Sequence, residues 1–208
     1  MKRLLMLMAF ASLVLAAFLS IDTATATSSI AGADHVSWDI ISLDTSTTPP
    51  TLSPGGVAFA AAKNPSSLTI RLTGSGTFVA PASGGPSGAV TGGGTWETFN
   101  TGVSTGSGTY SVTGLASWQF ANLQSPGPID LIGPVGTAAN GNAILRIQYS
   151  DGSDGILGVG CHGPGALAGI VEGVIATKDF VTYWDAQVPV GGVDANRTTF
   201  HVLRGSNN

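Results

Sequence analysis

Short runs of β-branched and aromatic residues recur along this chain, separated by clusters of Gly, Pro, Ser and Asn. Beyond residue 26 no stretch shows the 3.6-residue repeat of an amphipathic helix. Such runs without helical segments between them are typical of antiparallel β-sheets. We therefore predict an all-β domain, a single β-barrel or β-sandwich of about 8–10 strands without significant helix. The expected strands lie near residues 36–42, 57–62, 68–73, 76–80, 94–99, 108–120, 143–149, 156–162, 170–177 and 198–204.

Glycine and cysteine usage agree with this class. Thirty of the 208 residues are glycine, without a Gly-X-Y period, which indicates many turns rather than a collagen helix. The single cysteine excludes an internal disulfide, so a hydrophobic core has to supply the stability.

The N-terminus has the pattern of a secretory signal peptide. Lys2 and Arg3 precede an uncharged apolar run, and Ala24-Thr25-Ala26 supplies the small-x-small pattern of a cleavage site. We predict a signal peptide over residues 1–26 and one secreted β domain over residues 27–208, located in the periplasm or outside the cell. The alternative is an uncleaved anchor, because the apolar run is long enough to cross a bilayer.

Charge limits the partners. The chain carries 8 Lys and Arg against 12 Asp and Glu, a net charge of −4 at pH 7. It therefore lacks the basic surface that binds nucleic acid or anionic lipid. We expect no nucleic-acid partner, and no membrane contact after signal cleavage. The oligomeric state does not follow from the sequence.

Two glycine- and proline-rich stretches are expected to be loops. Residues 81–94 are of low complexity. Residues 121–142 are longer than a connection needs, which makes them a candidate lid or binding loop. Alternatively, Leu131 and Ile132 close one end of the core.

The stretch GVGCHG at residues 158–163 matches the glycine pattern of dinucleotide-binding turns. That motif has to open a helix, yet here Pro164-Gly165 and a strand-like run follow. The acidic residue expected about 20 positions later is also wrong, since Glu172 comes only nine residues after Gly163. We reject a nucleotide site and predict no cofactor.

The same stretch forms the second half of a predicted hairpin, AILRIQYS-DGSDG-ILGVGCH. A five-residue loop would put Tyr149 opposite Leu157 and Arg146 opposite Gly160. Cys161 then points into the core and His162 points away from it. The two side chains would not form a catalytic pair.

Extending the alternation to the run GIVEGVIATK places Glu172 beside Gly160. Arg146, Gly160 and Glu172 would then form one row across three strands, with His162 one pair away. This row is a candidate ligand site. The alternative is an ordinary surface salt bridge between Arg146 and Glu172.

Glu97 and Trp96 complete the candidate ligand-binding residues. Glu97 and Glu172 are the two glutamates beyond the signal peptide, and glycoside hydrolysis needs two carboxyl groups. Trp96 offers an aromatic surface for a sugar. The three histidines show no zinc-ligand spacing, and we predict no metal site. Asn196 begins the glycosylation sequence NRT.

At LRIQYSDGSDGILGVGCHG, EGVIATKDFVTYW and GVDANRTTFHVLR the chain resembles bacterial exported proteins without an assigned activity. The resemblance covers roughly residues 93–204. It implies a bacterial source and an extracellular or periplasmic location, and it implies no chemistry.

The leading functional hypothesis is a secreted domain that binds a small molecule or carbohydrate without converting it. One alternative is a hydrolase or isomerase that uses Glu172, His162 and Arg146. The other is a structural protein of the cell envelope or extracellular space.

The signal-peptide hypothesis predicts a defined N-terminus. Mass spectrometry of the protein from culture medium or periplasm should find Thr27 as the first residue, because signal peptidase cleaves after the A-x-A pattern. A full-length chain retained with the cells would support the anchor instead.

Overall fold

The computed structural model describes residues 32–81, 85–188 and 195–205, and the predicted signal peptide lies outside them. Within these ranges the chain forms fourteen strands and no helix, which confirms the all-β class. None of the described residues therefore belongs to a helix that could cross a membrane. The strands are β1 (Asp34–Asp44), β2 (Thr51–Ser53), β3 (Ala58–Ala61), β4 (Leu68–Leu72), β5 (Ser75–Ala80), β6 (Val90–Asn100), β7 (Val103–Leu123), β8 (Ile129–Asp130), β9 (Ala138–Tyr149), β10 (Asp154–Cys161), β11 (Gly173–Lys178), β12 (Val181–Tyr183), β13 (Asp185–Ala186) and β14 (Arg197–Leu203).

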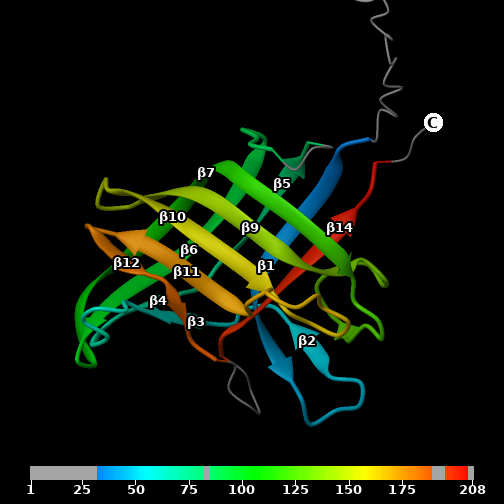
Figure 1. Ribbon diagram of the computed structural model, residues 1–208, viewed down its shortest axis with the longest axis horizontal. Coiled ribbons are helices and arrows are strands. Elements are labelled where there is room, and N and C mark those ends of the chain that lie inside the picture. Colours follow the sequence, from blue (N-terminus) through cyan, green and yellow to red (C-terminus); the bar gives the residue numbers. More distant parts are fainter. Residues whose placement is uncertain (1–31, 82–84, 189–194, 206–208) are drawn as a thin grey trace, which may run out of the picture. The chain divides into compact units, whose positions relative to one another are not determined.

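Six of these strands close into an antiparallel barrel (Figure 1). Their order is β9-β14-β1-β5-β6-β7, and β7 pairs again with β9. Of the two architectures that the sequence allowed, the barrel is the one found. The strand number exceeds the expected 8–10, partly because the short strands β2, β8, β12 and β13 lie in segments that were expected to be connections or parts of longer runs.

The remaining strands leave the barrel at two branch points. The edge of β9 that faces away from β7 pairs first with β14, at Ala138 and Ala139, and then with β10, from Gly141 onward. In the same way β6 pairs with β5 and then with β4. Strands β11 and β12 continue the sheet beyond β10, and β3 and β13 continue it beyond β4. Among the described strands, β2 and β8 form the one parallel pair.

β7 is longer than the expected strand at residues 108–120 and is interrupted by three register shifts against β9. Such bulges increase the bend and twist that a closed barrel requires. They also break the simple alternation. Leu115 is fully buried and Ala116 only partly, whereas strict alternation would have pointed Ala116 inward.

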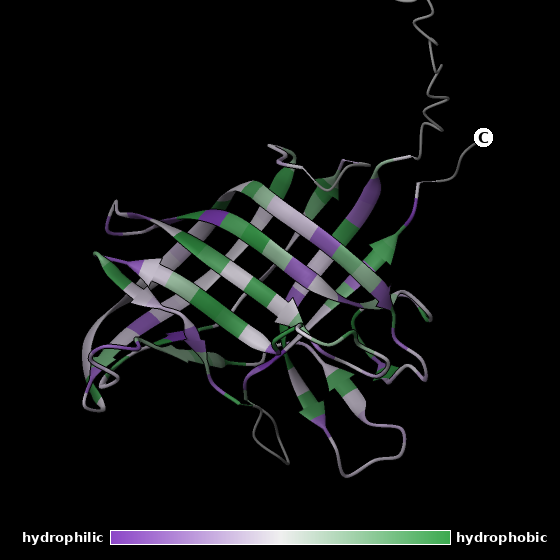
Figure 2. Ribbon diagram, in the orientation of Figure 1, coloured by the Kyte–Doolittle hydropathy of each residue, from purple (hydrophilic) through white to green (hydrophobic). Residues whose placement is uncertain are grey.

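Aromatic side chains fill the barrel interior. Trp118 makes edge-to-face contacts with Phe200 and Phe78, with centroid distances of 4.6 and 5.4 Å. Trp38 and Trp96 are also buried, whereas Trp184 is exposed. Figure 2 shows hydrophilic and hydrophobic residues alternating along the barrel strands, as expected when one face of each strand is buried.

Both predicted loops are partly strand. Residues 90–94 begin β6, and residues 82–84 of the first loop lie outside the described residues. The second loop, residues 121–142, begins in β7, contains β8 and ends in β9. Leu131 is 63% exposed, so it does not close the core.

The hairpin of β9 and β10 forms, but its register differs from the predicted one. Leu157 lies opposite Leu145 instead of Tyr149, and the turn is tighter, with the Tyr149 N–H donating to the carbonyl oxygen of Ser153. The cross-strand partner of each residue is displaced by four residues. Because four is even, each side chain keeps its predicted face while its cross-strand partner changes.

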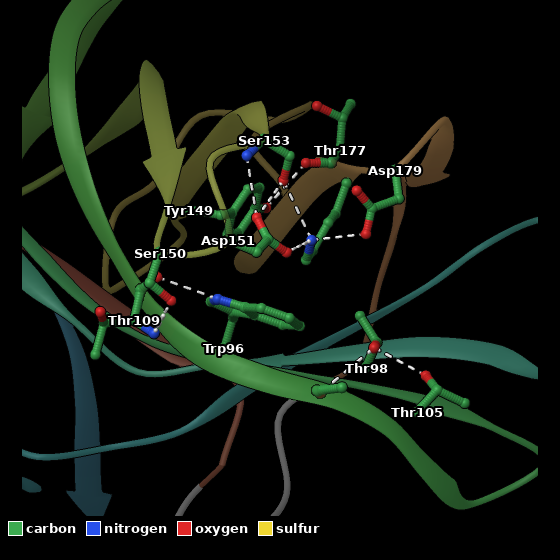
Figure 3. A network of polar contacts seen from close by, with 12 residues as sticks. Trp96, Thr98, Thr105, Thr109, Tyr149, Ser150, Asp151, Ser153, Thr177 and Asp179 are labelled. Atoms are coloured by element: carbon green, nitrogen blue, oxygen red, sulfur yellow. Dashed lines mark hydrogen bonds and ion pairs between the residues drawn. The ribbon is translucent and has the colours of Figure 1, made fainter.

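Lys178, on β11, carries its ammonium group into the interior, and its side chain is 1% exposed. Its Nζ lies 2.5 Å from Asp151 and 2.6 Å from Asp179, and 4.3 Å from the ring centroid of Trp96. Figure 3 shows the two aspartates gathered beside this ring, together with Tyr149. The hydrogen bond from Lys178 holds the pKa of Asp151 at about 2. The cluster ties the turn between β9 and β10 to the end of β11.

Lys178→Met should destabilise the fold by about 1–3 kcal/mol, because it removes charge-assisted hydrogen bonds and a cation–π contact. The Asp151 contribution is present above the ordinary aspartate pKa of about 4 and is lost as the pH falls from there toward 2. Denaturant unfolding as a function of pH measures both effects. Lys63→Met, at an exposed lysine, is the control, and equal losses in the two variants would contradict this role.

Candidate functional site

A pocket of about 230 Å³ lies where β10 ends and β14 begins. Two of the five predicted ligand-binding residues, His162 and Glu172, line it. The complete lining is Ile41, Leu43, Pro49, Pro50, Leu52, Gln124, Pro126, Gly127, Pro128, Cys161, His162, Gly163, Pro164, Glu172, Arg197 and Thr198.

Most of the wall is aliphatic. Ile41, Leu43 and Leu52 come from β1 and β2, and the segments 49–50 and 126–128 add prolines. The second segment belongs to the stretch that was expected to be a lid or binding loop. It lines the pocket, and its role in binding stays a prediction.

Glu172 connects the two strands that diverge at the pocket. Its Oε2 accepts a hydrogen bond from the N–H of His162, just after β10, and its Oε1 accepts one of 2.7 Å from the N–H of Thr198 in β14. The hydroxyl of Thr198 donates to the carbonyl oxygen of Gly160 at 2.6 Å. The carboxylate therefore accepts hydrogen bonds from backbone N–H groups at both diverging strands, just after β10 and within β14.

Burial raises the pKa of Glu172. The hydrogen bonds from His162 and Thr198 and the charge of Arg197 act in the opposite direction and offset this effect only in part. A carboxyl group with a raised pKa, in a pocket, is a marker of functional sites as well as of structural networks.

His162 is exposed and its tautomer follows from one contact. Its Nδ1 lies 2.8 Å from the carbonyl oxygen of Ile170. Because a carbonyl oxygen only accepts, Nδ1 has to carry the hydrogen. In the neutral ring Nε2 is then a hydrogen-bond acceptor.

Cys161 is 1% exposed and points inward, as predicted. Its thiol lies 3.4 Å from Nε2 of Gln124, and burial raises its pKa. His162 contacts Ile170 and Glu172 instead, so the two residues do not form a nucleophile–base pair.

Asn140 shapes the turn after Cys161 and was missed in the sequence. This fully buried side chain accepts a hydrogen bond of 2.7 Å from the N–H of Gly163 and donates one of 3.1 Å to the carbonyl oxygen of Pro164. Gln124, Arg197 and Thr198 were missed as well, since their segments are brought here only by the fold.

Arg146 lies outside the pocket, and the predicted row of Arg146, Gly160 and Glu172 is wrong. Gly160 faces Asn142 in the observed register, and Arg146 faces Ile156 on the exposed side of the sheet. Among the described residues Arg146 forms no ion pair. The cause is the different hairpin register, which displaces each cross-strand partner by four residues.

Glu97 and Trp96 also lie outside the pocket lining, and as neighbours on β6 they point to opposite faces. Glu97 forms a partly exposed ion pair with Arg71, whereas the buried ring of Trp96 packs on Lys178. The two glutamates therefore do not share this pocket. Ligand binding by Trp96 or Glu97 at another surface stays a prediction.

Asn196 is 4% exposed and its amide is engaged on both sides. Oδ1 accepts from the N–H of Phe59 at 2.6 Å, and Nδ2 donates to the carbonyl oxygen of Val188 at 3.1 Å. The folded chain thus offers no accessible amide for glycosylation at NRT.

In the described ranges no three His, Cys, Asp or Glu side chains gather as a metal site would require.

In comparisons with known proteins, no protein-family model, no curated protein and no solved structure matches this chain.

Glu172→Gln should destabilise the fold by about 1–3 kcal/mol, because an amide nitrogen replaces one of two accepting oxygens. The raised pKa gives native Glu172 a stabilising contribution that is present below the unfolded pKa of about 4.3 and is lost as the pH rises through the folded value. The stability of the variant should therefore fall less over this interval.

Unfolding in denaturant at several pH values measures both quantities. Glu97→Gln is the matched control, since its exposed ion pair should contribute less than about 1 kcal/mol. An equal pH dependence in wild type and Glu172→Gln would show that Glu172 is not perturbed.

Proposed function

We propose that the protein binds, without converting it, a small and largely apolar molecule carrying one hydroxyl or similar polar group. The pocket beside Glu172 is the site of binding. The observation that carries this proposal is an aliphatic and proline-rich wall with a single exposed imidazole at its rim. With the predicted signal peptide, such a protein would act in the periplasm or outside the cell.

The pocket volume limits the size of the ligand. Its volume of about 230 Å³ lies between the roughly 150 Å³ of a cavity that holds benzene and the roughly 300 Å³ at which drug-sized pockets begin. A single ring or a short branched chain would fit this space.

The polar groups favour a neutral ligand with one hydrogen-bond donor. Both oxygens of Glu172 are already bonded to backbone N–H groups. The positively charged Arg197 lies in the same lining as the carboxyl group of Glu172, so the lining favours neither a cationic nor an anionic ligand. Nε2 of His162 can accept a hydrogen bond from a ligand hydroxyl. A sugar would need hydrogen-bond partners for several hydroxyl groups and an aromatic ring to stack on. Among the described lining residues, the imidazole of His162 is the one aromatic ring. The pocket wall therefore favours a ligand with a single hydroxyl over a carbohydrate.

A proton-transfer enzyme, such as an isomerase or hydrolase, is the second candidate for the same pocket. The raised pKa of Glu172 beside His162 favours it, because general acids and bases are tuned in this way. Arg146 has no part in it, since it does not line the pocket. In an enzyme of this kind Glu172→Gln would stop turnover, whereas in a binding protein there is no turnover to lose.

Phenol, toluene and glucose are suitable probes. Nuclear magnetic resonance titration of the labelled protein should show phenol binding more tightly than toluene, by up to about tenfold, because His162 accepts one hydrogen bond. His162→Phe should remove this preference and leave toluene binding unchanged. Glucose should not shift the signals of the pocket residues.

Leu43→Asp tests the wall. This side chain is only partly buried, so the fold should tolerate the charge, while the apolar probes should no longer bind. Leu131→Asp, at an exposed leucine outside the pocket, is the control and should bind as wild type does. Equal binding by both variants, or binding of glucose alone, would overturn the proposal.

A further inference from the structure

A second site is centred on a buried histidine on the outer face of the barrel. His201 of β14 lies directly opposite Ser37 of β1, and Thr77 of β5 lies opposite Ser37 on its other side. Directly opposed residues point to the same face of a sheet, at a strand spacing of about 4.8 Å. The three side chains therefore form a row of imidazole, hydroxyl and hydroxyl, called here the His201 row.

The hydrogen bonds along this row have a defined direction. Nε2 of His201 lies 2.6 Å from Oδ2 of Asp130, and Nδ1 lies 3.4 Å from Oγ of Ser37. A carboxylate accepts, so Nε2 carries a hydrogen and Nδ1 of the neutral ring is free to accept the hydroxyl hydrogen of Ser37. This is the order of an acid, base and nucleophile relay, with the two ring nitrogens exchanged relative to the serine proteases.

Asp130 is the charged residue of this relay. Its Oδ1 accepts hydrogen bonds from the N–H groups of Ile132 and Gly133, and its side chain is 6% exposed. Burial opposes ionisation, but these bonds and His201 together lower the pKa of Asp130. The 2.6 Å contact between Oδ2 of Asp130 and Nε2 of His201 orients the imidazole, while burial raises the pKa of the neighbouring Asp39.

The segment after β8 covers the imidazole. A Cβ atom on Gly133 would overlap the His201 ring, so glycine at this position lets the backbone lie directly on the ring. His201 is 3% exposed as a result. The Asp130–His201 pair is thereby shielded from water, which strengthens its electrostatic interaction.

Ser37 is partly exposed. It lines, with His201 and Thr77, a pocket of about 230 Å³ whose other walls include Val79, Pro134 and Leu203. Thr77 is exposed, and its hydroxyl lies 2.7 Å from that of Thr91. Either hydroxyl can donate in this pair, and when Thr91 donates, the hydroxyl hydrogen of Thr77 is available to a ligand oxygen. This pocket shares no lining residue with the pocket beside Glu172, and the inference does not rest on the proposed function.

We propose that Ser37 is a nucleophile for esters with a short acyl chain, with His201 as the general base, Asp130 as its orienting carboxylate and Thr77 as the donor to the developing oxyanion. Oγ of Ser37 attacks the ester carbonyl carbon while its proton passes to Nδ1 of His201. The bond to the leaving alcohol breaks, and the alcohol takes this proton from His201. Water then attacks the acyl carbon while its proton passes to Nδ1 of His201. The bond between the acyl carbon and Oγ of Ser37 breaks, Oγ takes this proton back from His201, and the acid leaves.

Phenylmethanesulfonyl fluoride and p-nitrophenyl acetate test the site. The sulfonyl fluoride should add one sulfonyl group per folded chain, and peptide mapping by mass spectrometry should place it on Ser37. This mapping uses the unaltered protein, so it does not depend on the folding of a variant. Denatured protein should not be labelled at Ser37, because the relay exists only in the fold.

Variants separate the roles. Ser37→Ala should lose the label and the release of p-nitrophenol, whereas Ser42→Ala, on the same strand, should keep both. Thr77→Val should slow hydrolysis on the order of 100-fold and still be labelled. Absence of a label, a label on His35 or another residue, or unchanged hydrolysis in Ser37→Ala would each overturn the proposal.

Discussion

The structure depends on one strand that is paired along both edges. β7 binds β6 through its first half and β9 through the remainder, and this closes the barrel. Closure removes free edges and gives the strands a shared interior, which Trp38, Trp118 and Phe200 fill. The register shifts along β7 are part of this constraint, because a regular strand of 21 residues would not bend enough to meet both neighbours.

Closure of the barrel also determines where the pocket beside Glu172 forms. β9 has a single edge left for two partners, so β14 and β10 have to part along it. Where sheet pairing stops, backbone groups lose their partners and need side chains instead. Glu172 serves the N–H groups of His162 and Thr198, and Asn140 serves Gly163 and Pro164. The split in the sheet thus explains why Glu172 and Asn140 stand at this place, and aliphatic side chains and prolines line the pocket beside Glu172.

The polar groups on the outer face of the barrel have a different physical cause. On β1 and β14 one face packs into the barrel, and the other carries Ser37, Asp39 and His201. The segment from Asp130 to Pro134 covers part of that second face, so groups that would be solvated on an open sheet become buried and have to pair with one another. A strongly oriented histidine is the result.

The sequence alone determined the fold class and the face of each residue in the clearest hairpin. Alternation of side chains along a strand is a local property with a period of two. It places Cys161 inward and His162 outward for any loop with an odd number of residues. The tertiary structure decided the register, which separates Arg146 from Glu172, because turn geometry and packing choose among registers of equal parity. It also decided the partners of Glu172 and His201. Thr198 lies 26 residues from Glu172 and Asp130 lies 71 from His201, and only closure of the barrel brings such distant segments into contact.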